Sequence, residues 1–185
     1  MLYSSEIETP LGPMVAAATD EGLCLLEFAD RPELATELSL FEKHFQCAVR
    51  ERAGHPVLGQ IERELREYFS GDLKRFATPI RKPLLGTEFQ RSIWDALMRI
   101  PYGATRSYGQ LAASIDRASA VRAVGAANGA NRMAIIVPCH RVIGSDGSLT
   151  GYAGGIERKR SLLNLEGVRI APAKLSADSL SLFDV

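Results

Sequence analysis

The chain has 185 residues, of which 46% are hydrophobic and 24% are charged. This composition is typical of a soluble globular protein with one ordinary domain or two small ones. No apolar run approaches membrane-spanning length, and no basic segment precedes an apolar stretch at the N-terminus, so we expect neither a membrane anchor nor a signal peptide. The three cysteines are widely spaced and form no Cys-x-x-Cys pair, which argues against a disulfide framework and favours a reducing compartment, the cytoplasm.

The net charge of zero is unevenly distributed along the chain. Residues 1–83 carry 10 Lys and Arg against 14 Asp and Glu, whereas residues 84–170 carry 11 against 6. Residues 171–185 carry 1 against 2. A basic segment joined to an acidic one suggests a polyanionic partner for one domain only, although a solvated charged surface explains the same pattern.

The N-terminal part predicts a small antiparallel sheet and two helices. Within residues 1–28, apolar runs are separated by turn sequences, which is the pattern of β-hairpins. A polar helix is expected over residues 32–45 and a more amphipathic one over residues 56–69. Two prolines and a glycine within residues 76–86 indicate a linker between domains. The inner face of the amphipathic helix is expected to hold Val57, Leu58, Ile61, Leu65 and Phe69.

A helical region with two capping boxes follows the linker. Thr-x-x-Gln at residues 87–90 opens one helix, and Ser-x-x-Gln at residues 107–110 opens a short helix that runs through Ser114. Ser119 is a good N-cap for a third helix that runs through Asn128, and this pair of short helices fits a helix-turn-helix. The third helix offers few side chains that read base edges, so it suits DNA binding by shape and phosphate. Tight packing of a small-residue helix against a neighbour is the alternative.

A thiol and an imidazole follow one another at Cys139 and His140, directly after an apolar, β-branched run. We expect residues 135–137 to be strand-like and to stop at Pro138, which presents the next side chains at the end of an element. Cysteine reacts as its thiolate, and a neighbouring histidine supplies the base or the cation that a reactive thiol needs. An isolated Cys-His pair is more often a buried structural cysteine with a chance neighbour. Further motifs are therefore needed to identify Cys139 as a reactive residue.

Six sequence motifs follow one another in the C-terminal part of the chain. They are Ser-Tyr-Gly-Gln-Leu-Ala at 107–112, Arg-Ala-Val-Gly at 122–125, Asn131, Pro-Cys-His-Arg-Val-Ile at 138–143, Gly-Tyr-Ala-Gly-Gly at 151–155 and Leu-Leu-x-x-Glu-Gly at 162–167. In this order they resemble the O6-alkylguanine-DNA alkyltransferases, most strongly over residues 84–169. The resemblance implies an α+β protein with a ribonuclease H-like α/β domain over residues 1–80 and a winged helix-turn-helix domain over residues 84–170. A flexible C-terminal tail is expected over residues 171–185.

The resemblance implies a repair reaction on a guanine that is flipped out of double-stranded DNA. Cys139 would attack the alkyl carbon on O6 and keep the alkyl group, so that each molecule reacts once. His140 would act as the base through a water, with Glu166 orienting it. Asn131 would brace the loop and the thiolate, and Tyr108 would donate a proton toward the leaving guanine. We therefore expect a monomer that acts on double-stranded DNA containing O6-alkylguanine, with O4-alkylthymine as a further candidate and without a dissociable cofactor.

The resemblance also assigns residues to DNA binding and to the guanine pocket. Arg122 would enter the base stack and fill the space left by the flipped nucleotide. Some relatives have a serine in place of Ala153, so one hydroxyl contact to guanine is missing here. Vertebrate relatives bind zinc in the N-terminal domain, whereas the spacing of His and Cys here fits no usual zinc pattern, and we expect no metal site. The remaining assignments are DNA contacts for Tyr108, Arg117 and Ser145, and a pocket lined by Val142, Tyr152, Ala153 and Gly154.

Three other functions remain open at this point. A lesion sensor of the same fold would flip alkylguanine without reacting, but such proteins lack the cysteine. A transcription factor would use the helix-turn-helix, against which the third helix argues because it has few base-reading side chains. A cysteine hydrolase would need an acyl-binding site, for which no feature is visible.

The tail carries one further motif, Ser-Leu-Ser-Leu-Phe at Ser179–Phe183. It resembles the Gln-Leu-Ser-Leu-Phe peptide by which bacterial replication and repair proteins bind the sliding clamp, with Ser in place of Gln. A flexible terminus of this kind can insert apolar side chains into a groove of a partner. The alternative is an apolar end that packs on its own domain.

Overall fold

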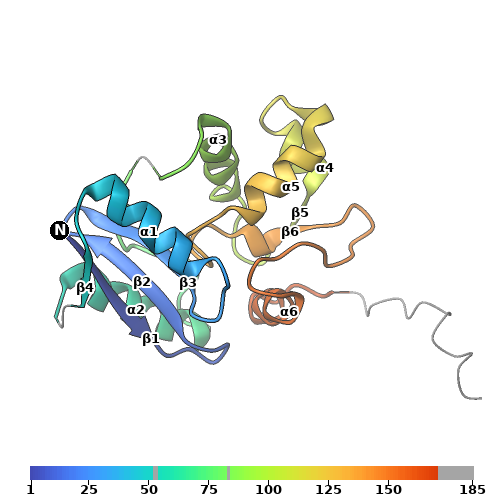
Figure 1. Cartoon of the computed structure of the whole chain (residues 1–185). Coiled ribbons are helices and arrows are strands. Elements are labelled where there is room, and N and C mark those ends of the chain that lie inside the picture. Colours follow the sequence, from blue (N-terminus) through green and yellow to red (C-terminus); the bar gives the residue numbers. More distant parts are fainter. Residues whose placement is uncertain (52–53, 83, 171–185) are drawn as a thin grey trace, which may run out of the picture.

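The computed structural model describes residues 1–51, 54–82 and 84–170 (Figure 1). The tail predicted over residues 171–185, with its clamp-like motif, lies outside the described residues. None of the helices within the described ranges has the length and apolar character needed to cross a membrane.

The N-terminal part is a four-stranded sheet in the order β3-β2-β1-β4. β1 pairs antiparallel with β2, β2 pairs antiparallel with β3, and β4 adds to the edge of β1 in parallel. The expected hairpins are therefore confirmed, whereas the short β4 was not predicted. The strands are β1 (Leu2–Ile7), β2 (Met14–Thr19), β3 (Gly22–Phe28) and β4 (Val49–Glu51).

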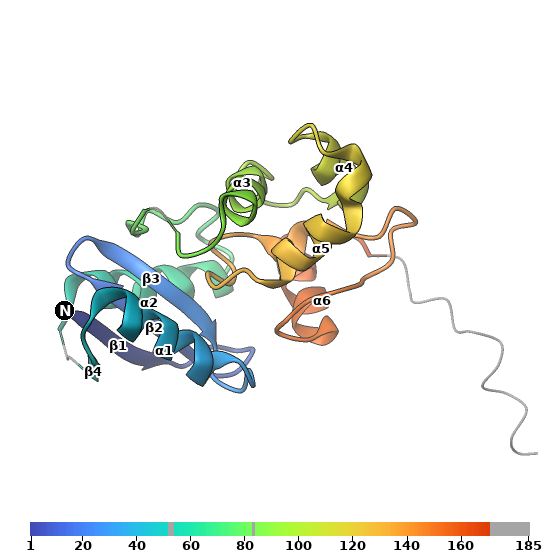
Figure 2. The same ribbon diagram turned by 45° about the horizontal axis from the view of Figure 1, so that its top comes forward.

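Two helices cover opposite faces of this sheet (Figures 1 and 2). They are α1 (Leu34–Phe45) and α2 (Pro56–Phe69), and the bounds of α2 are those predicted from its apolar periodicity. Successive side chains of β2 point to opposite faces, so that Ala17 packs in the cluster under α1 while Ala16 packs in the cluster under α2. On α2 the most deeply buried aromatic ring is that of Tyr68, with Phe69 only partly buried.

The C-terminal part contains the predicted helix-turn-helix. Both capping boxes are present, one before α3 and one before α4. The third helix begins with a 3₁₀ turn at Ala118–Ala120 before α5. β5 and β6 pair in parallel and form the small sheet of this domain. Its elements are α3 (Glu88–Leu97), β5 (Arg106–Ser107), α4 (Tyr108–Ala113), α5 (Val121–Gly129), β6 (Val142–Ile143) and α6 (Ile156–Leu165).

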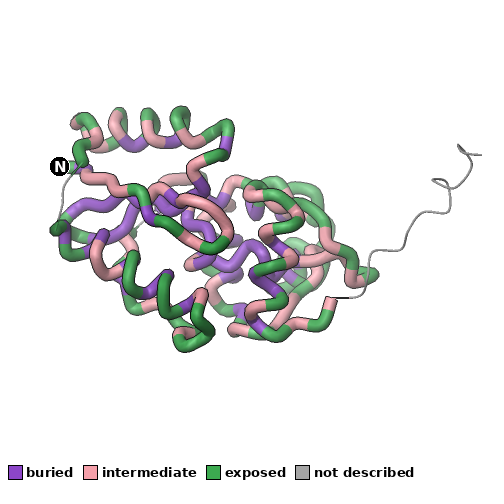
Figure 3. Tube along the Cα trace, turned by 90° about the horizontal axis from the view of Figure 1, so that it is seen from below, coloured by how far each residue is buried: buried purple, intermediate pink, exposed green. Residues whose placement is uncertain are grey.

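The two parts share one hydrophobic core, which runs from α2 and the sheet to α3, α5 and α6. Figure 3 shows buried segments passing through the middle of the molecule, between the two halves. The main chain also joins them, because Leu26 of β3 donates its N–H to the Arg132 carbonyl at 2.9 Å and accepts from the Ala134 N–H at 2.8 Å. The loop that leads to Cys139 is thus attached to the edge of the N-terminal sheet.

Candidate active site

The segment before Cys139 is a turn, and the prediction of a strand-like segment at residues 135–137 was wrong. Ile135 has a φ of 70°, a left-handed conformation that is unusual for a β-branched residue. Ile135 and Val137 are both buried. The apolar run therefore predicted the burial of these side chains correctly, but it did not predict the turn of the backbone. Pro138 then leads into a 3₁₀ turn, Cys139–Arg141, which carries the predicted reactive residues.

Asn131 holds the Cys139 sulfur in place. Its Nδ2 lies 3.1 Å from Sγ of Cys139 and also donates to the Val137 carbonyl at 2.8 Å, while its Oδ1 accepts from the Met133 N–H at 3.0 Å. Cys139 is only 6% exposed, and this burial raises the pKa of its thiol to about 11. The hydrogen bond from Asn131 acts in the opposite direction. At neutral pH the group is a thiol, so the chemistry of a thiolate requires a base.

His140 and Glu166 form a buried pair from two different elements. Nε2 of His140 lies 2.9 Å from Oε1 of Glu166, which follows α6, and both side chains are fully buried. Arg141 donates from Nε to Oε2 at 2.8 Å and from Nη2 to Oε1 at 2.9 Å, and the Gly103 N–H donates to Oε2 at 3.3 Å. Although burial by itself raises the pKa of the Glu166 carboxyl, the bonds from His140 and Arg141 hold it at about 2. Glu166 is therefore a carboxylate at neutral pH.

This pairing determines which nitrogen of His140 carries the proton. A carboxylate only accepts hydrogen bonds, so Nε2 of His140 is the donor and Nδ1 is left with a lone pair. Nδ1 is buried and has no hydrogen-bond partner among the described residues. Burial lowers the pKa of His140, so the ring is neutral at pH 7. Within the described part of the chain, the Cys139 sulfur is hydrogen-bonded to Asn131 and no hydrogen bond joins it directly to His140, so the bridging water stays a prediction.

Tyr108 and a buried lysine hold the loop that follows β6. The Tyr108 hydroxyl donates to the carbonyls of Thr150 and Gly151, each at 3.2 Å. Nζ of Lys159 donates to the Thr150 carbonyl at 2.6 Å and to the Val142 carbonyl at 2.5 Å. Burial lowers the pKa of Lys159 to about 8. Its positive charge also lowers the pKa of the nearby thiol.

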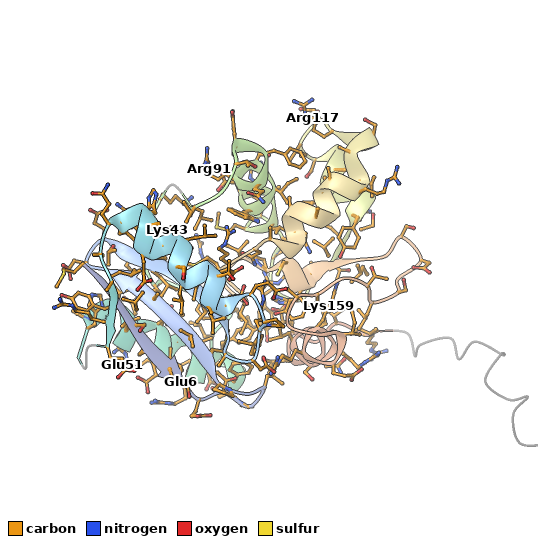
Figure 4. All side chains as sticks on the ribbon, viewed as in Figure 1. Glu6, Lys43, Glu51, Arg91, Arg117 and Lys159 are labelled. Carbon is orange, nitrogen blue, oxygen red and sulfur yellow. The ribbon has the colours of Figure 1, made fainter. Side chains whose placement is uncertain are left out.

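Lys159 was missed in the sequence because it lies in the charged run Glu157–Arg160. Leu162 and Leu163, three and four residues later, are both fully buried on the same helix, α6. Helical spacing places Lys159 on this inner face, which is the signal that could have found it. Figure 4 shows Lys159 beside the loop after β6 and Arg117 at the opposite, outer end of the helix-turn-helix.

Of the predicted pocket residues, Tyr152, Ala153 and Gly154 lie in this loop and Val142 lies in β6. Val142 is fully buried, and the buried hydroxyl of Tyr152 has no partner among the described residues. A side chain at Gly154 would place its Cβ 2.7 Å from the Tyr152 ring and 3.0 Å from the ring of Phe28. Close packing thus requires glycine at position 154. A flipped guanine that passes close to the backbone there would require it as well. Ala153 is exposed.

The predicted DNA contacts lie on the surface of the C-terminal domain. Arg117, Arg122 and Ser145 are exposed, and Tyr108 is half-buried. On α5, Val124 faces the core while Arg122 and its small neighbours face outward. Tight packing against a neighbour, the alternative to DNA binding for this helix, is found on the inner side of α5. There the Trp94 Nε1–H donates to the Ala127 carbonyl at 2.9 Å. The outer side of α5 is available to a partner.

The N-terminal domain contributes a buried charge that the sequence did not reveal. Glu27 is 2% exposed and pairs with Arg31 at 2.7 Å. Burial raises the pKa of Glu27 to about 7, and its negative charge raises the pKa of the Cys139 thiol. Within the described ranges no three His, Cys, Asp or Glu side chains are grouped as metal ligands.

Two family descriptions together match most of the chain. Residues 2–81 match the ribonuclease-like domain of 6-O-methylguanine DNA methyltransferase, and residues 88–168 match its DNA-binding domain. A methylated-DNA–protein-cysteine methyltransferase of Mycobacterium tuberculosis is 43% identical over 178 residues, which cover 95% of this chain and 98% of the relative. The crystal structure of the O6-methylguanine methyltransferase from the same organism matches with a TM-score of 0.77 at 42% identity, over 95% of this chain and 98% of that one. A structure described as that organism's OGT in complex with DNA matches with a TM-score of 0.76 at 42% identity, over 89% and 92% of the two chains.

Proposed function

The chain belongs to the 6-O-methylguanine DNA methyltransferase family, and we propose that it repairs O6-alkylguanine in double-stranded DNA by moving the alkyl group to its own Cys139. One observation carries this assignment. The Cys139 sulfur is held by Asn131, and the adjacent His140 is oriented by a buried carboxylate that leaves Nδ1 free to accept a proton.

The proposed reaction is a single in-line displacement. The thiol proton passes to His140 through a water, which a neutral imidazole permits and a thiol with a pKa of about 11 requires. The Cys139 sulfur then forms a bond to the alkyl carbon while the bond from that carbon to O6 breaks. The guanine leaves with the electron pair and takes up a proton from Tyr108; the phenolate then regains a proton from solvent, and the imidazolium of His140 releases one to solvent. Because the thioether is stable, the protein reacts once.

Tyr108 has to exchange partners to play this part. Its hydroxyl donates to the carbonyls of Thr150 and Gly151. A guanine that enters next to Val142 and Gly154 would offer a new acceptor to the same hydroxyl. The loop would then stay attached through Lys159, which bonds the Thr150 carbonyl independently.

DNA binding is proposed for the outer face of α5 and its surroundings. Small side chains allow the helix backbone to approach the duplex closely, and Arg122 is the side chain that would enter the stack. Arg117 and Ser145 would contact the backbone from the neighbouring loops. The positive charge of residues 84–170 supports this placement.

Peptide mapping after reaction with labelled DNA tests the proposal. The protein is incubated with duplex DNA carrying a labelled methyl group on guanine O6. We expect a one-to-one burst of label on Cys139, and Cys139→Ala should bind the lesion without taking up label. Repeated turnover, or label on Cys24 or Cys47, would contradict the proposal.

Two finer proposals concern partners. We infer a monomer, which size-exclusion chromatography with light scattering would test against a dimer. We also propose that Ser179–Phe183, outside the described residues, binds the bacterial sliding clamp weakly. Calorimetry with a peptide of residues 174–185 is the test. Absence of binding at high micromolar concentration, or no loss on combining Leu182→Ala with Phe183→Ala, rules the clamp contact out.

A further inference from the structure

Tyr68 reaches from the N-terminal domain into the buried pair at the active site. It lies on α2, its side chain is fully buried, and its hydroxyl donates to Oε1 of Glu166 at 2.8 Å. Its ring packs against Phe76 and, edge to face, against Tyr102. The ring is held on several sides, so the direction of the hydroxyl is determined by packing.

The oxygen that Tyr68 binds is the one that His140 binds. Oε1 of Glu166 accepts from Tyr68 at 2.8 Å, from Nε2 of His140 at 2.9 Å and from Nη2 of Arg141 at 2.9 Å. Each donor withdraws negative charge from the carboxylate and lowers its basicity. A weaker carboxylate stabilises the protonated imidazole less, so Tyr68 opposes the rise in basicity that Glu166 alone would give to His140.

Resting on the function proposed above, we propose that Tyr68 is a positioning residue for alkyl transfer, which acts through Glu166 to orient His140 and to limit the basicity of its ring. The charged groups that face His140 are Glu166, Arg141 and Lys159. Tyr102 lies near Glu166 but donates to the Leu165 carbonyl instead. Loss of the Tyr68 hydroxyl alone therefore changes the donor set of Glu166 without removing a charge.

The expected consequence is a shift in a pH profile. In Tyr68→Phe, one donor no longer withdraws negative charge from the Glu166 carboxylate. The carboxylate then stabilises the imidazolium more, so the pKa of His140 rises. Because His140 acts as a base in its neutral form, the acidic limb of the rate profile should move to higher pH by about half a unit or more, the effect of one buried hydrogen bond. Incorporation of 3-fluorotyrosine at position 68 makes the phenol a stronger donor and should move the limb the other way.

The experiment uses the full chain and free O6-benzylguanine, which needs no base flipping. The burst amplitude counts the molecules that are folded and reactive, and the rate constant measured from pH 5 to pH 8 reports their reactivity. Tyr102→Phe is the matched control, because it removes a neighbouring phenol hydroxyl that is not bonded to the carboxylate. The Cε1 proton of His140 is followed by NMR over the same pH range, with His140→Gln used to assign its signal.

Parallel shifts of the rate profile and of the NMR titration in Tyr68→Phe, with Tyr102→Phe unchanged, support the proposal. An unchanged midpoint with a reduced amplitude would show that Tyr68 only supports the fold and would overturn it. Equal shifts in both variants would overturn it as well. If the wild-type protein takes up neither the benzyl group of O6-benzylguanine nor the methyl group of O6-methylguanine in duplex DNA, the proposed function fails, and the NMR titration still decides the role of Tyr68.

Discussion

Replacement of Glu166 by glutamine should cost about 3 kcal/mol of folding free energy at pH 7. Glu166 is 4% exposed and accepts hydrogen bonds from His140, Arg141 and Tyr68. Burial alone raises the pKa of this carboxyl, but the bonds from His140 and Arg141 hold it at about 2, against 4.5 for the unperturbed group. Since one pKa unit corresponds to about 1.4 kcal/mol, the difference is worth about 3 kcal/mol. The value agrees with the cost of about 3–5 kcal/mol for removing one partner of a buried ion pair.

The sign of the pH dependence follows from the lowered pKa. The stabilisation is fully present above pH 4.5, where the carboxyl is ionised in both folded and unfolded chains, and it is lost as the pH falls toward 2. By pH 3 about 2 of the 3 kcal/mol should be gone. The difference in unfolding free energy between the wild type and Glu166→Gln should therefore be large at pH 7 and small at pH 3.

Urea denaturation at these two pH values measures that difference. The control is Glu62→Gln on α2, which removes a carboxylate from an exposed pair with Arg66 at 3.2 Å and should change stability little at either pH. A loss below about 1 kcal/mol at pH 7 for Glu166→Gln would refute the reasoning. So would a loss of equal size at both pH values, because the effect would then not come from the ionised carboxylate.

Three further substitutions test the remaining assignments. Arg122→Ala should slow repair of duplex DNA by about one to two orders of magnitude but leave the reaction with free O6-benzylguanine nearly unchanged, and equal losses would show that Arg122 supports the fold instead. Asn131→Ala removes the donor that opposes the effect of burial on the Cys139 thiol. The pKa of the thiol should therefore rise further, and the benzyl-transfer rate at pH 7 should fall about tenfold. An unchanged pH–rate profile would contradict this. Glu27→Gln removes a charge that raises the thiol pKa, so benzyl transfer should be faster at pH 8. The pKa of Glu27 is raised to about 7 by burial, so the stability that its protonated form contributes is present below pH 4.5 and lost as the pH rises through 7. Urea denaturation of Glu27→Gln should show a flatter dependence on pH over that window.

Local signals in the sequence predicted most of the elements. The helix over residues 56–69 has the predicted bounds, and both capping boxes close as expected. Caps and amphipathic periodicity act within a few residues, so they can be read before the fold is known. The pair of Cys139 and His140 could likewise be located because the two residues are adjacent and belong to a recognisable motif.

Contacts between distant segments could not be predicted in the same way. Tyr68 and Glu166 are 98 residues apart, and no periodicity or spacing in the sequence relates them. The turn at Ile135 was missed for a different reason. β-branched apolar residues favour strands on average, but the segment just before Ile135 is held in place because Leu26 donates to the Arg132 carbonyl and accepts from the Ala134 N–H. The tertiary structure then compensates for a backbone conformation that Ile135 would avoid by itself.

These contacts show that the N-terminal domain supports the geometry of the site in the C-terminal domain. Sequence alone places the reactive thiol, the helix-turn-helix and the excess positive charge in residues 84–170. In the structure, β3 holds the loop before Cys139, Phe28 packs against Gly154 of the proposed pocket, and Tyr68 binds the carboxylate that orients His140. An isolated C-terminal segment would keep the reacting atoms and lose all three supports. The geometry of the site therefore depends on the acidic N-terminal domain, although none of the residues proposed to touch DNA lies in it.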